Sequence, residues 1–128
     1  MKKNTVFIVD DDALLLEMLS DYLRTEFPHL SIHGFKTGEE CLANLDLLPD
    51  LVILDYYLNS REKEASNGID ILKQIRSLSK TLPVIMLSSQ KSYSVAAQSI
   101  ERGAIHYVIK GQDAFKEIGE LVKANLRN

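Results

Sequence analysis

Short apolar runs and longer amphipathic segments alternate along the chain. Four of the apolar runs are rich in β-branched or aromatic residues and too short for helices: Thr5–Val9, Leu51–Leu54, Pro83–Leu87 and Ile105–Ile109. In Leu51–Leu54 and Pro83–Leu87, a continuous apolar run of this length predicts a strand that is buried on both faces, as in a parallel sheet. Leu30–Phe35 instead alternates apolar and polar residues, which predicts a half-buried strand at a sheet edge.

The segments between these runs carry apolar residues at three- and four-residue spacing, the period of an amphipathic helix. We expect five helices: Ala13 to Phe27, Thr37 to about Leu48, Ile69 to Leu78, Ser92 to Arg102, and Phe115 to Leu126. In the second helix, Thr37 and Glu40 would form a capping box. Its inner face would consist of Cys41, Leu42, Leu45 and Leu48. Strand followed by helix, five times over, predicts an α/β fold with one doubly wound parallel sheet.

Composition agrees with one ordinary globular domain over residues 1–128. The chain is 45% hydrophobic and 26% charged, and its net charge of −3 lacks the basic footprint of a nucleic-acid-binding domain. A single cysteine, Cys41, excludes an intramolecular disulfide framework and agrees with a reducing compartment. No apolar run is long enough to span a membrane, and the first residues do not resemble a signal peptide. We therefore expect a cytoplasmic domain that binds neither nucleic acid nor membrane.

Reactive side chains follow four of the five expected strands. They are the acids Asp10 to Asp12, then Asp55, then Ser88 and Ser89, and finally Lys110. Because the carboxyl ends of parallel strands lie at one edge of a sheet, we expect these groups to converge there. Clustered carboxylates repel one another unless a cation lies among them, and oxygen ligands of this kind suit Mg²⁺ or Mn²⁺.

The same set of groups suits phosphoryl chemistry. A carboxylate can attack phosphorus and form an aspartyl phosphate. The protein then mainly positions the reacting groups and neutralises charge on the phosphoryl oxygens. A metal ion, the Lys110 amine and a Ser88 hydroxyl would cover three such oxygens.

Five short motifs, in this order and spacing, resemble the receiver domain of two-component response regulators: Val9–Asp11, Pro49–Asp55, Asn67–Gly68, Pro83–Ser88 and Tyr107–Lys110. The resemblance covers essentially the whole chain. It implies a flavodoxin-like sheet with strand order 2-1-3-4-5. It also implies a signalling domain that assists its own phosphotransfer and dephosphorylation, rather than an enzyme acting on a separate substrate.

The resemblance implies a role for each candidate site residue. Asp55 matches the phosphoacceptor, and Lys110 matches the lysine that pairs with the phosphate. Ser88 matches the switch Ser/Thr, and Tyr107 the aromatic that changes rotamer on activation. The expected Mg²⁺ ligands are Asp10, Asp11, Asp55 and the main-chain carbonyl of Tyr57.

The implied partners are a histidine kinase or phosphotransfer protein upstream and an effector domain or protein downstream. A phosphohistidine would donate its phosphoryl group to Asp55, after which Ser88 and Tyr107 would move. The surface of the fourth helix, fifth strand and fifth helix would then change between two populated states. That surface is also where such a domain would form a homodimer.

Two features of the loops depart from the family's pattern. The segment between Asp55 and Gly68 is several residues longer than usual, and Ser60 to Ser66 is either a contact for a kinase or effector or a solvated insertion. Gly111 stands where most receivers have a cis proline, so we expect a trans Lys110–Gly111 bond.

Tyr57 and Gln90 flank the path of the hydrolytic water in the family. A side chain as bulky as Tyr57 would shield an acyl phosphate and lengthen its life.

Three alternatives remain open at this point. The Asp10-Asp11-Asp12 run contains the Asp-x-Asp of haloacid-dehalogenase-like phosphatases, although a second downstream acidic pair is missing and Asp55 is left unexplained. The second alternative is a receiver that is never phosphorylated and serves as a scaffold. The third is that the chain is the receiver of a longer regulator with a DNA-binding domain. For single residues, Asp12 is expected only to favour a helix N-terminus, and Tyr107 is either a switch or a packing residue.

Overall fold

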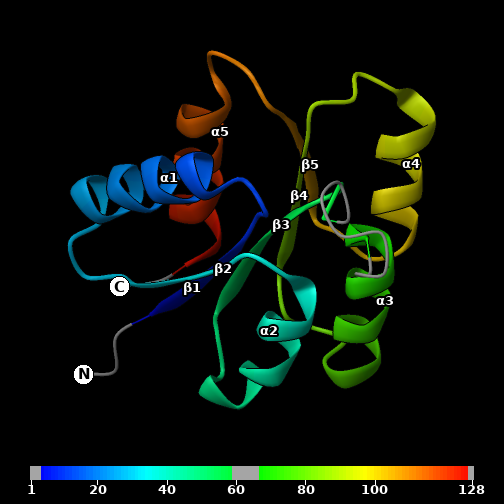
Figure 1. Cartoon of the computed structure of the whole chain (residues 1–128), viewed down its shortest axis with the longest axis horizontal. Helices are drawn as coiled ribbons and strands as arrows, with labels where there is room; N and C mark the ends of the chain where they lie inside the picture. Colours follow the sequence, from blue (N-terminus) through cyan, green and yellow to red (C-terminus); the bar gives the residue numbers. More distant parts are fainter. Residues whose placement is uncertain (1–3, 59–66, 127–128) are drawn as a thin grey trace.

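The protein, described here by a computed structural model over residues 4–58 and 67–126, contains one parallel five-stranded sheet. The strands lie in the order β2-β1-β3-β4-β5 (Figure 1), which confirms the predicted topology. Their bounds are β1 Thr5–Val9, β2 Ser31–Phe35, β3 Leu51–Asp55, β4 Val84–Ser88 and β5 His106–Ile109. The predicted alternating strand, β2, is at an edge, while β3 and β4 are buried along their whole length.

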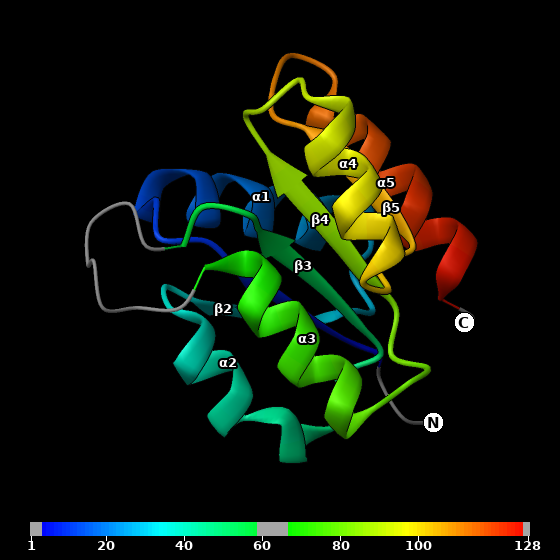
Figure 2. The ribbon, with the colours of Figure 1, turned by 90° about the vertical axis from the view of Figure 1, so that its right-hand side faces the viewer.

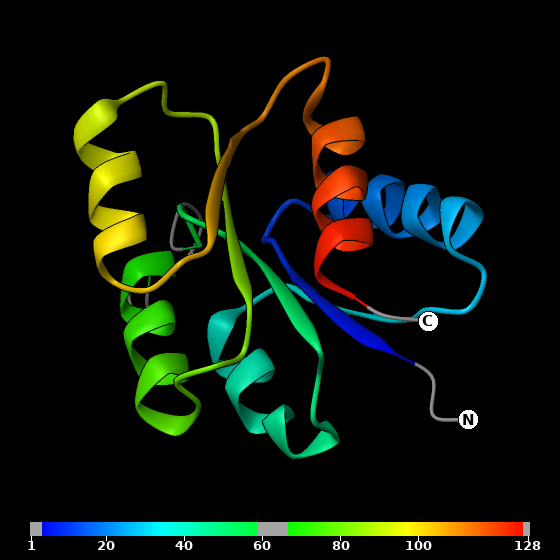
Figure 3. The ribbon, with the colours of Figure 1, turned by 180° about the vertical axis from the view of Figure 1, so that it is seen from behind.

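Helices cover both faces of the sheet. On one face lie α1 (Ala13–Glu26) and α5 (Ala114–Asn125), and on the other lie α2 (Gly38–Ala43), α3 (Gly68–Leu78) and α4 (Tyr93–Glu101), as Figures 1 and 3 show. Within the described residues, no helix combines the length and the apolar character needed to cross a membrane.

Alternate residues of each central strand pack into two separate cores because successive strand side chains point to opposite faces. The core beneath α2 and α3 is built around Phe7, Val52, Met86, Ile71 and Leu72. The core beneath α1 and α5 is built around Ile8, Ile53, Ile85, Leu19 and Ile118. Burial on both faces fixes the strand register and therefore fixes which residue stands at each strand end.

The helix predicted from Thr37 to about Leu48 is shorter than expected. Thr37 caps it as predicted, with Oγ1 accepting from the Glu40 N–H at 3.1 Å. The Glu40 carboxylate in turn accepts from the Thr37 hydroxyl at 3.2 Å. However, α2 ends at Ala43, and a 3₁₀ turn, η1 (Leu45–Leu47), follows. Leu48 has a left-handed backbone (φ 55°) and is 65% exposed, so placing it on the inner face was wrong. A residue before proline is disfavoured in the right-handed helical region, and Pro49 therefore prevents the helix from running through Leu48.

The other helices lie close to their predicted bounds. Asp12 caps α1, its side chain accepting from the N–H groups of Leu14 and Leu15, and the helix stops before Pro28. The third helix extends to Leu78 as predicted, although the Leu78 side chain is 70% exposed rather than packed.

All five strands run in the same direction, so their carboxyl ends share one edge of the sheet (Figure 2). The loops after β1, β3, β4 and β5 therefore start next to one another. This edge carries the predicted site residues. The proposals for Ser60 to Ser66 concern residues outside the described part of the chain.

Candidate functional site

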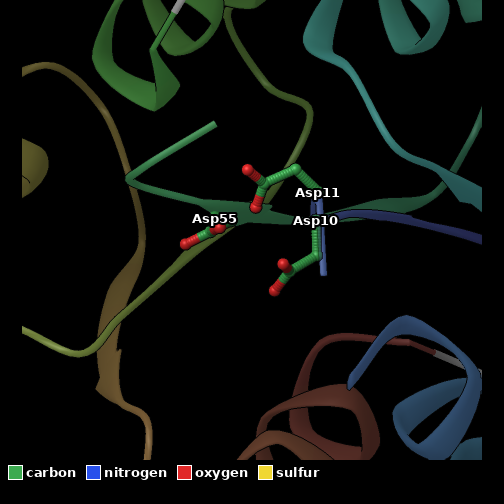
Figure 4. Close-up of side chains that lie close together, drawn as sticks. All are labelled: Asp10, Asp11 and Asp55. Atoms are coloured by element: carbon green, nitrogen blue, oxygen red, sulfur yellow. The ribbon is translucent and has the colours of Figure 1, made fainter. Parts of the chain in front are cut away.

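Three carboxylates meet at the ends of two neighbouring strands (Figure 4). Asp10 and Asp11 directly follow β1, and Asp55 is the last residue of β3. One oxygen from each lies within 4.8 Å of the other two. Asp10 and Asp55 are 1% and 2% exposed, and Asp11 is half-buried. The three acids therefore lie together at this edge of the sheet, as predicted.

Lys110 provides the positive charge facing these acids. Its Nζ lies 3.3 Å from Asp10 Oδ2 and 3.4 Å from Asp55 Oδ1. The main chain holds the lysine at this edge, since its N–H donates to the Ser88 carbonyl at 2.7 Å. The side chain thus reaches back from β5, past β4, to the acids at the ends of β1 and β3.

Burial and mutual repulsion make these carboxylates weaker acids than usual. Burial, together with the neighbouring charge of Asp10, raises the pKa of Asp55 to about 7, and Lys110 only partly opposes this. Burial likewise raises the pKa of Asp10. For Lys110, burial acts to lower the pKa, but the charges of Asp55 and Asp10 outweigh it and the net shift is upward. The site therefore has an excess of buried negative charge.

The oxygen atoms at this site fit a divalent cation. Asp10 Oδ1 accepts the N–H of Asp12 at 2.9 Å, whereas Asp10 Oδ2 is fully buried and has no hydrogen bond of acceptable geometry. Within the described part of the chain, the one positive group beside this oxygen is the Lys110 ammonium at 3.3 Å, and three carboxylates within 4.8 Å of one another leave negative charge that a cation would neutralise. Carboxylate oxygens suit Mg²⁺ or Mn²⁺. The ligand role of the Tyr57 carbonyl stays a prediction; the Tyr57 N–H donates to Asp55 Oδ1 at 3.3 Å.

Ser88 is the last residue of β4 and is fully buried at the same edge as Asp55. Its Oγ accepts the N–H of Gln90 at 3.1 Å. This hydroxyl therefore fixes the start of the loop toward α4, and its role toward a phosphoryl group stays a prediction.

Tyr107 lies on β5 and is half-buried. Its hydroxyl donates to the main-chain carbonyl of Gln90 at 2.7 Å. The ring also packs against the core beneath α2 and α3. Tyr107 therefore joins β5 to the loop before α4, and its change of rotamer stays a prediction.

Gly68 and Gly111 lie in loops next to the site, and Gly68 is in close contact with the main chain there. The Gly68 N–H donates to the Tyr56 carbonyl at 2.9 Å, and a Cβ at Gly68 would collide with the main chain of Asp55 and Tyr56. Because α3 starts directly against the end of β3, only glycine fits at position 68, which explains the Asn67–Gly68 motif. The sequence alone did not show this contact. The described residues contain no cis peptide bond, so the Lys110–Gly111 bond is trans as expected.

Residues 6–123 match the family model of the response regulator receiver domain. The chain belongs to this family. Receiver domains of this family are signalling domains of two-component systems, and the match gives no support to the phosphatase alternative.

Several curated relatives are similar to this receiver domain. The chain is 34% identical over 125 residues to the DNA-binding response regulator MtrA of Mycobacterium tuberculosis, covering 98% of this chain and 51% of that protein. It is 38% identical over 108 residues to the transcriptional regulatory protein CpxR of Klebsiella pneumoniae, covering 84% and 43%. A protein-glutamate methylesterase/protein-glutamine glutaminase of Bacillus subtilis is 37% identical over 108 residues, covering 82% and 29%. The chain thus spans about half the length, or less, of these relatives.

Solved structures show the same fold. A response regulator of Chloroflexus aurantiacus superposes with a TM-score of 0.82 at 31% identity, covering 98% of this chain and all of the other. The BeF3-activated receiver domain of DrrB superposes with a TM-score of 0.84 at 24% identity, covering 99% of this chain and 100% of that one.

Proposed function

We propose that this receiver domain accepts a phosphoryl group on Asp55 from the phosphohistidine of a histidine kinase or a phosphotransfer protein. The observation that carries the proposal is the position of Lys110, whose Nζ pairs with both Asp10 and Asp55 at 3.3 and 3.4 Å. A buried acid that is held beside a lysine and two further acids suits a phosphoacceptor better than it suits a structural ion pair, because the negative charges outnumber the positive one.

The chemistry follows from the placement of these groups. An oxygen of ionised Asp55 attacks phosphorus, the P–N bond of the phosphohistidine breaks, and the imidazole leaves as the neutral or protonated base. Lys110 pairs with a phosphoryl oxygen, and the Ser88 hydroxyl donates a hydrogen bond to another. A bound Mg²⁺ would neutralise charge on the transferring group, and its ligands would be Asp10, Asp11, Asp55 and the Tyr57 carbonyl.

The signal would leave the site through β4 and β5. When Ser88 turns toward the phosphoryl group it releases the Gln90 N–H, and the loop that also holds the Tyr107 hydroxyl is then free to move. The surface of α4, β5 and α5 would change as a population shift, and an effector domain, a partner protein or a second copy of the chain would bind the changed form. The exposed side chains of Ile100, Ile105 and Ile109 on α4 and around β5 give such a partner an apolar contact.

The test is incubation with acetyl phosphate and Mg²⁺, followed by intact mass spectrometry. A single phosphate adduct is expected on the wild type, and none on Asp55→Asn or in the presence of a chelator. Asp11→Asn should lose the adduct, whereas Asp12→Asn is the matched control and should keep it, because asparagine caps α1 as well as aspartate does.

Two other outcomes would contradict the proposal. Folded wild-type protein that takes up no phosphate under any condition would favour the scaffold alternative. Continuous release of phosphate that survives Asp55→Asn but not Asp10→Asn would indicate a phosphatase centred on the acids after β1.

A further inference from the structure

Tyr56 immediately follows the proposed phosphoacceptor, and its side chain contacts the output side of the molecule. Its hydroxyl donates to Oε1 of Gln98, a residue of α4, at 3.4 Å. Its ring packs against the core beneath α2 and α3, and lies edge-on to the ring of Tyr57 with centroids 4.8 Å apart. The same residue therefore contacts the core, the site loop and α4.

The main chain of Tyr56 is held on both sides, so the side chain has a fixed origin. Its N–H donates to the Leu87 carbonyl of β4 at 2.9 Å, and its carbonyl accepts the Gly68 N–H at 2.9 Å. Because the main chain is fixed and the ring packs against the core, the Tyr56 hydroxyl loses little further conformational freedom when it forms one more hydrogen bond.

Helix α4, by contrast, buries little of its own surface, although Arg76 holds the Gly103 carbonyl just after its C-terminal end. Ser99 is its one fully buried residue, and the Ser99 hydroxyl bonds within the helix, to the Val95 carbonyl at 2.9 Å. The Ser92 cap is also local. Tyr93 is 97% exposed, and the alanines of the helix bury little apolar surface. Elements with few buried apolar contacts are those that open or shift most easily.

We propose that Tyr56 is a positioning residue for α4, and that its hydroxyl bond to Gln98 ties this helix to the end of the strand that carries Asp55. The bond crosses from β3 to α4 without using Ser88 or Tyr107, which act on the loop before the helix. A displacement that carries Gln98 away from the end of β3 would break it. The inference rests on the proposed function, in which phosphorylation of Asp55 shifts α4.

Amide hydrogen exchange of the full chain tests the bond itself. Tyr56→Phe keeps the ring and removes only the hydroxyl, and Gln98→Leu removes the acceptor. Each should raise exchange of the peptides covering 93–101 by about twofold, the effect of one partly exposed hydrogen bond, while exchange in α3 stays unchanged. The double variant should show no larger change than either single variant. Tyr93→Phe is the matched control and should leave exchange unchanged.

The rate of phosphorylation tests the coupling. A bond that is lost when α4 moves disfavours the shifted form, so removing the bond raises the population of the form that phosphorylation favours. The rate of adduct formation with acetyl phosphate and Mg²⁺ should therefore rise by about twofold in Tyr56→Phe and in Gln98→Leu, and not in Tyr93→Phe.

Three results would overturn the inference: unchanged exchange in α4, additive effects in the double variant, or faster exchange with an unchanged phosphorylation rate. The last of these would leave Tyr56 as a stabilising residue only. Wild-type protein that forms no adduct would contradict the proposed function instead, and the exchange comparison would still decide whether Tyr56 and Gln98 act as one unit.

Discussion

At the scale of single residues, the site keeps more negative than positive charge buried. Asp55 is buried against Asp10, and Lys110 together with the main-chain N–H groups of Tyr57 and Asp12 offsets only part of this charge. The folded protein therefore binds a proton at Asp55 more strongly than the unfolded chain does. In the absence of a cation, ionisation of this residue works against folding.

Replacing Asp55 by asparagine should therefore stabilise the protein when no metal is present. The pKa of Asp55 is about 7 in the folded state against 3.8 for the ordinary carboxyl. Stability of the wild type should fall as pH rises from about 4 to about 7. At pH 8, Asp55→Asn should unfold with a free energy about 2 kcal/mol higher than the wild type, and the two should be equal below pH 4.

Urea denaturation in EDTA at pH 8 and at pH 4 measures this difference. Asp46→Asn, which changes an exposed acid on η1, is the matched control and should have no effect larger than about 0.5 kcal/mol. A wild type that is as stable as Asp55→Asn at pH 8 would show that the buried charge is offset in another way.

Tyr57 should prolong the life of a phosphorylated Asp55. Its N–H bonds to Asp55 Oδ1, and its ring, edge-on to Tyr56 and 36% exposed, starts two residues from the acid. Tyr57→Asn should shorten the half-life of the aspartyl phosphate severalfold, because a small polar residue admits and orients water. Loss of the adduct over time, followed by intact mass, gives the half-life. A variant as long-lived as the wild type would remove this role from Tyr57.

At the scale of elements, the path of the chain from α2 into β3 shows where local signals compete. The apolar spacing of Leu42, Leu45 and Leu48 predicts one continuous helix, whereas the structure has a short helix, a 3₁₀ turn and a left-handed residue. Pro49 excludes the right-handed region at Leu48, and Asn44 ends α2 by donating from Nδ2 to the Glu40 carbonyl at 2.8 Å.

Substitution at Leu48 distinguishes the two conformations. Glycine adopts a left-handed backbone without strain, and alanine does not, so Leu48→Gly should be more stable than Leu48→Ala by about 1 kcal/mol. In a helix the order would be reversed by a similar amount. Both substitutions remove the same exposed side chain, so the comparison isolates the backbone. Thermal or urea unfolding of the pair is sufficient, and a more stable alanine variant would restore the helical interpretation.

A second element-scale feature joins the ends of α3 and α4. The Arg76 guanidinium donates to the Gly103 carbonyl at 2.6 Å and 3.1 Å, and to the Ser79 carbonyl at 3.1 Å. It thus satisfies carbonyls after both helices. This anchors the C-terminal end of α4, while Tyr56 contacts its middle, and at the N-terminal end Tyr93 is 97% exposed.

At the scale of the whole molecule, the sequence predicts the fold well because the central strands β3 and β4 are buried on both faces. Runs such as Leu51–Asp55 and Val84–Ser88 have the length and composition of buried strands. Parallel topology then brings Asp10, Asp55 and Lys110 to one edge of the sheet. The contacts that connect the site to α4 could not be predicted in this way. The bonds from Tyr107 to Gln90 and from Tyr56 to Gln98 join residues that have no fixed spacing, and only the packed structure brings them together.

The balance of buried charge predicts how the whole domain responds to metal and pH together. Mg²⁺ bound to the folded state alone should raise the melting temperature, because binding to the native form adds to its stability. Near pH 6 most Asp55 carboxyls carry a proton that the metal must displace, since their pKa is about 7. The apparent Kd for Mg²⁺ should therefore be about tenfold weaker at pH 6 than at pH 8. Melting curves over a Mg²⁺ series at the two pH values give both constants. In Asp55→Asn the metal should bind more weakly at both values and its pH dependence should shrink. Equal wild-type constants at pH 6 and pH 8 would contradict proton displacement from Asp55 by the metal.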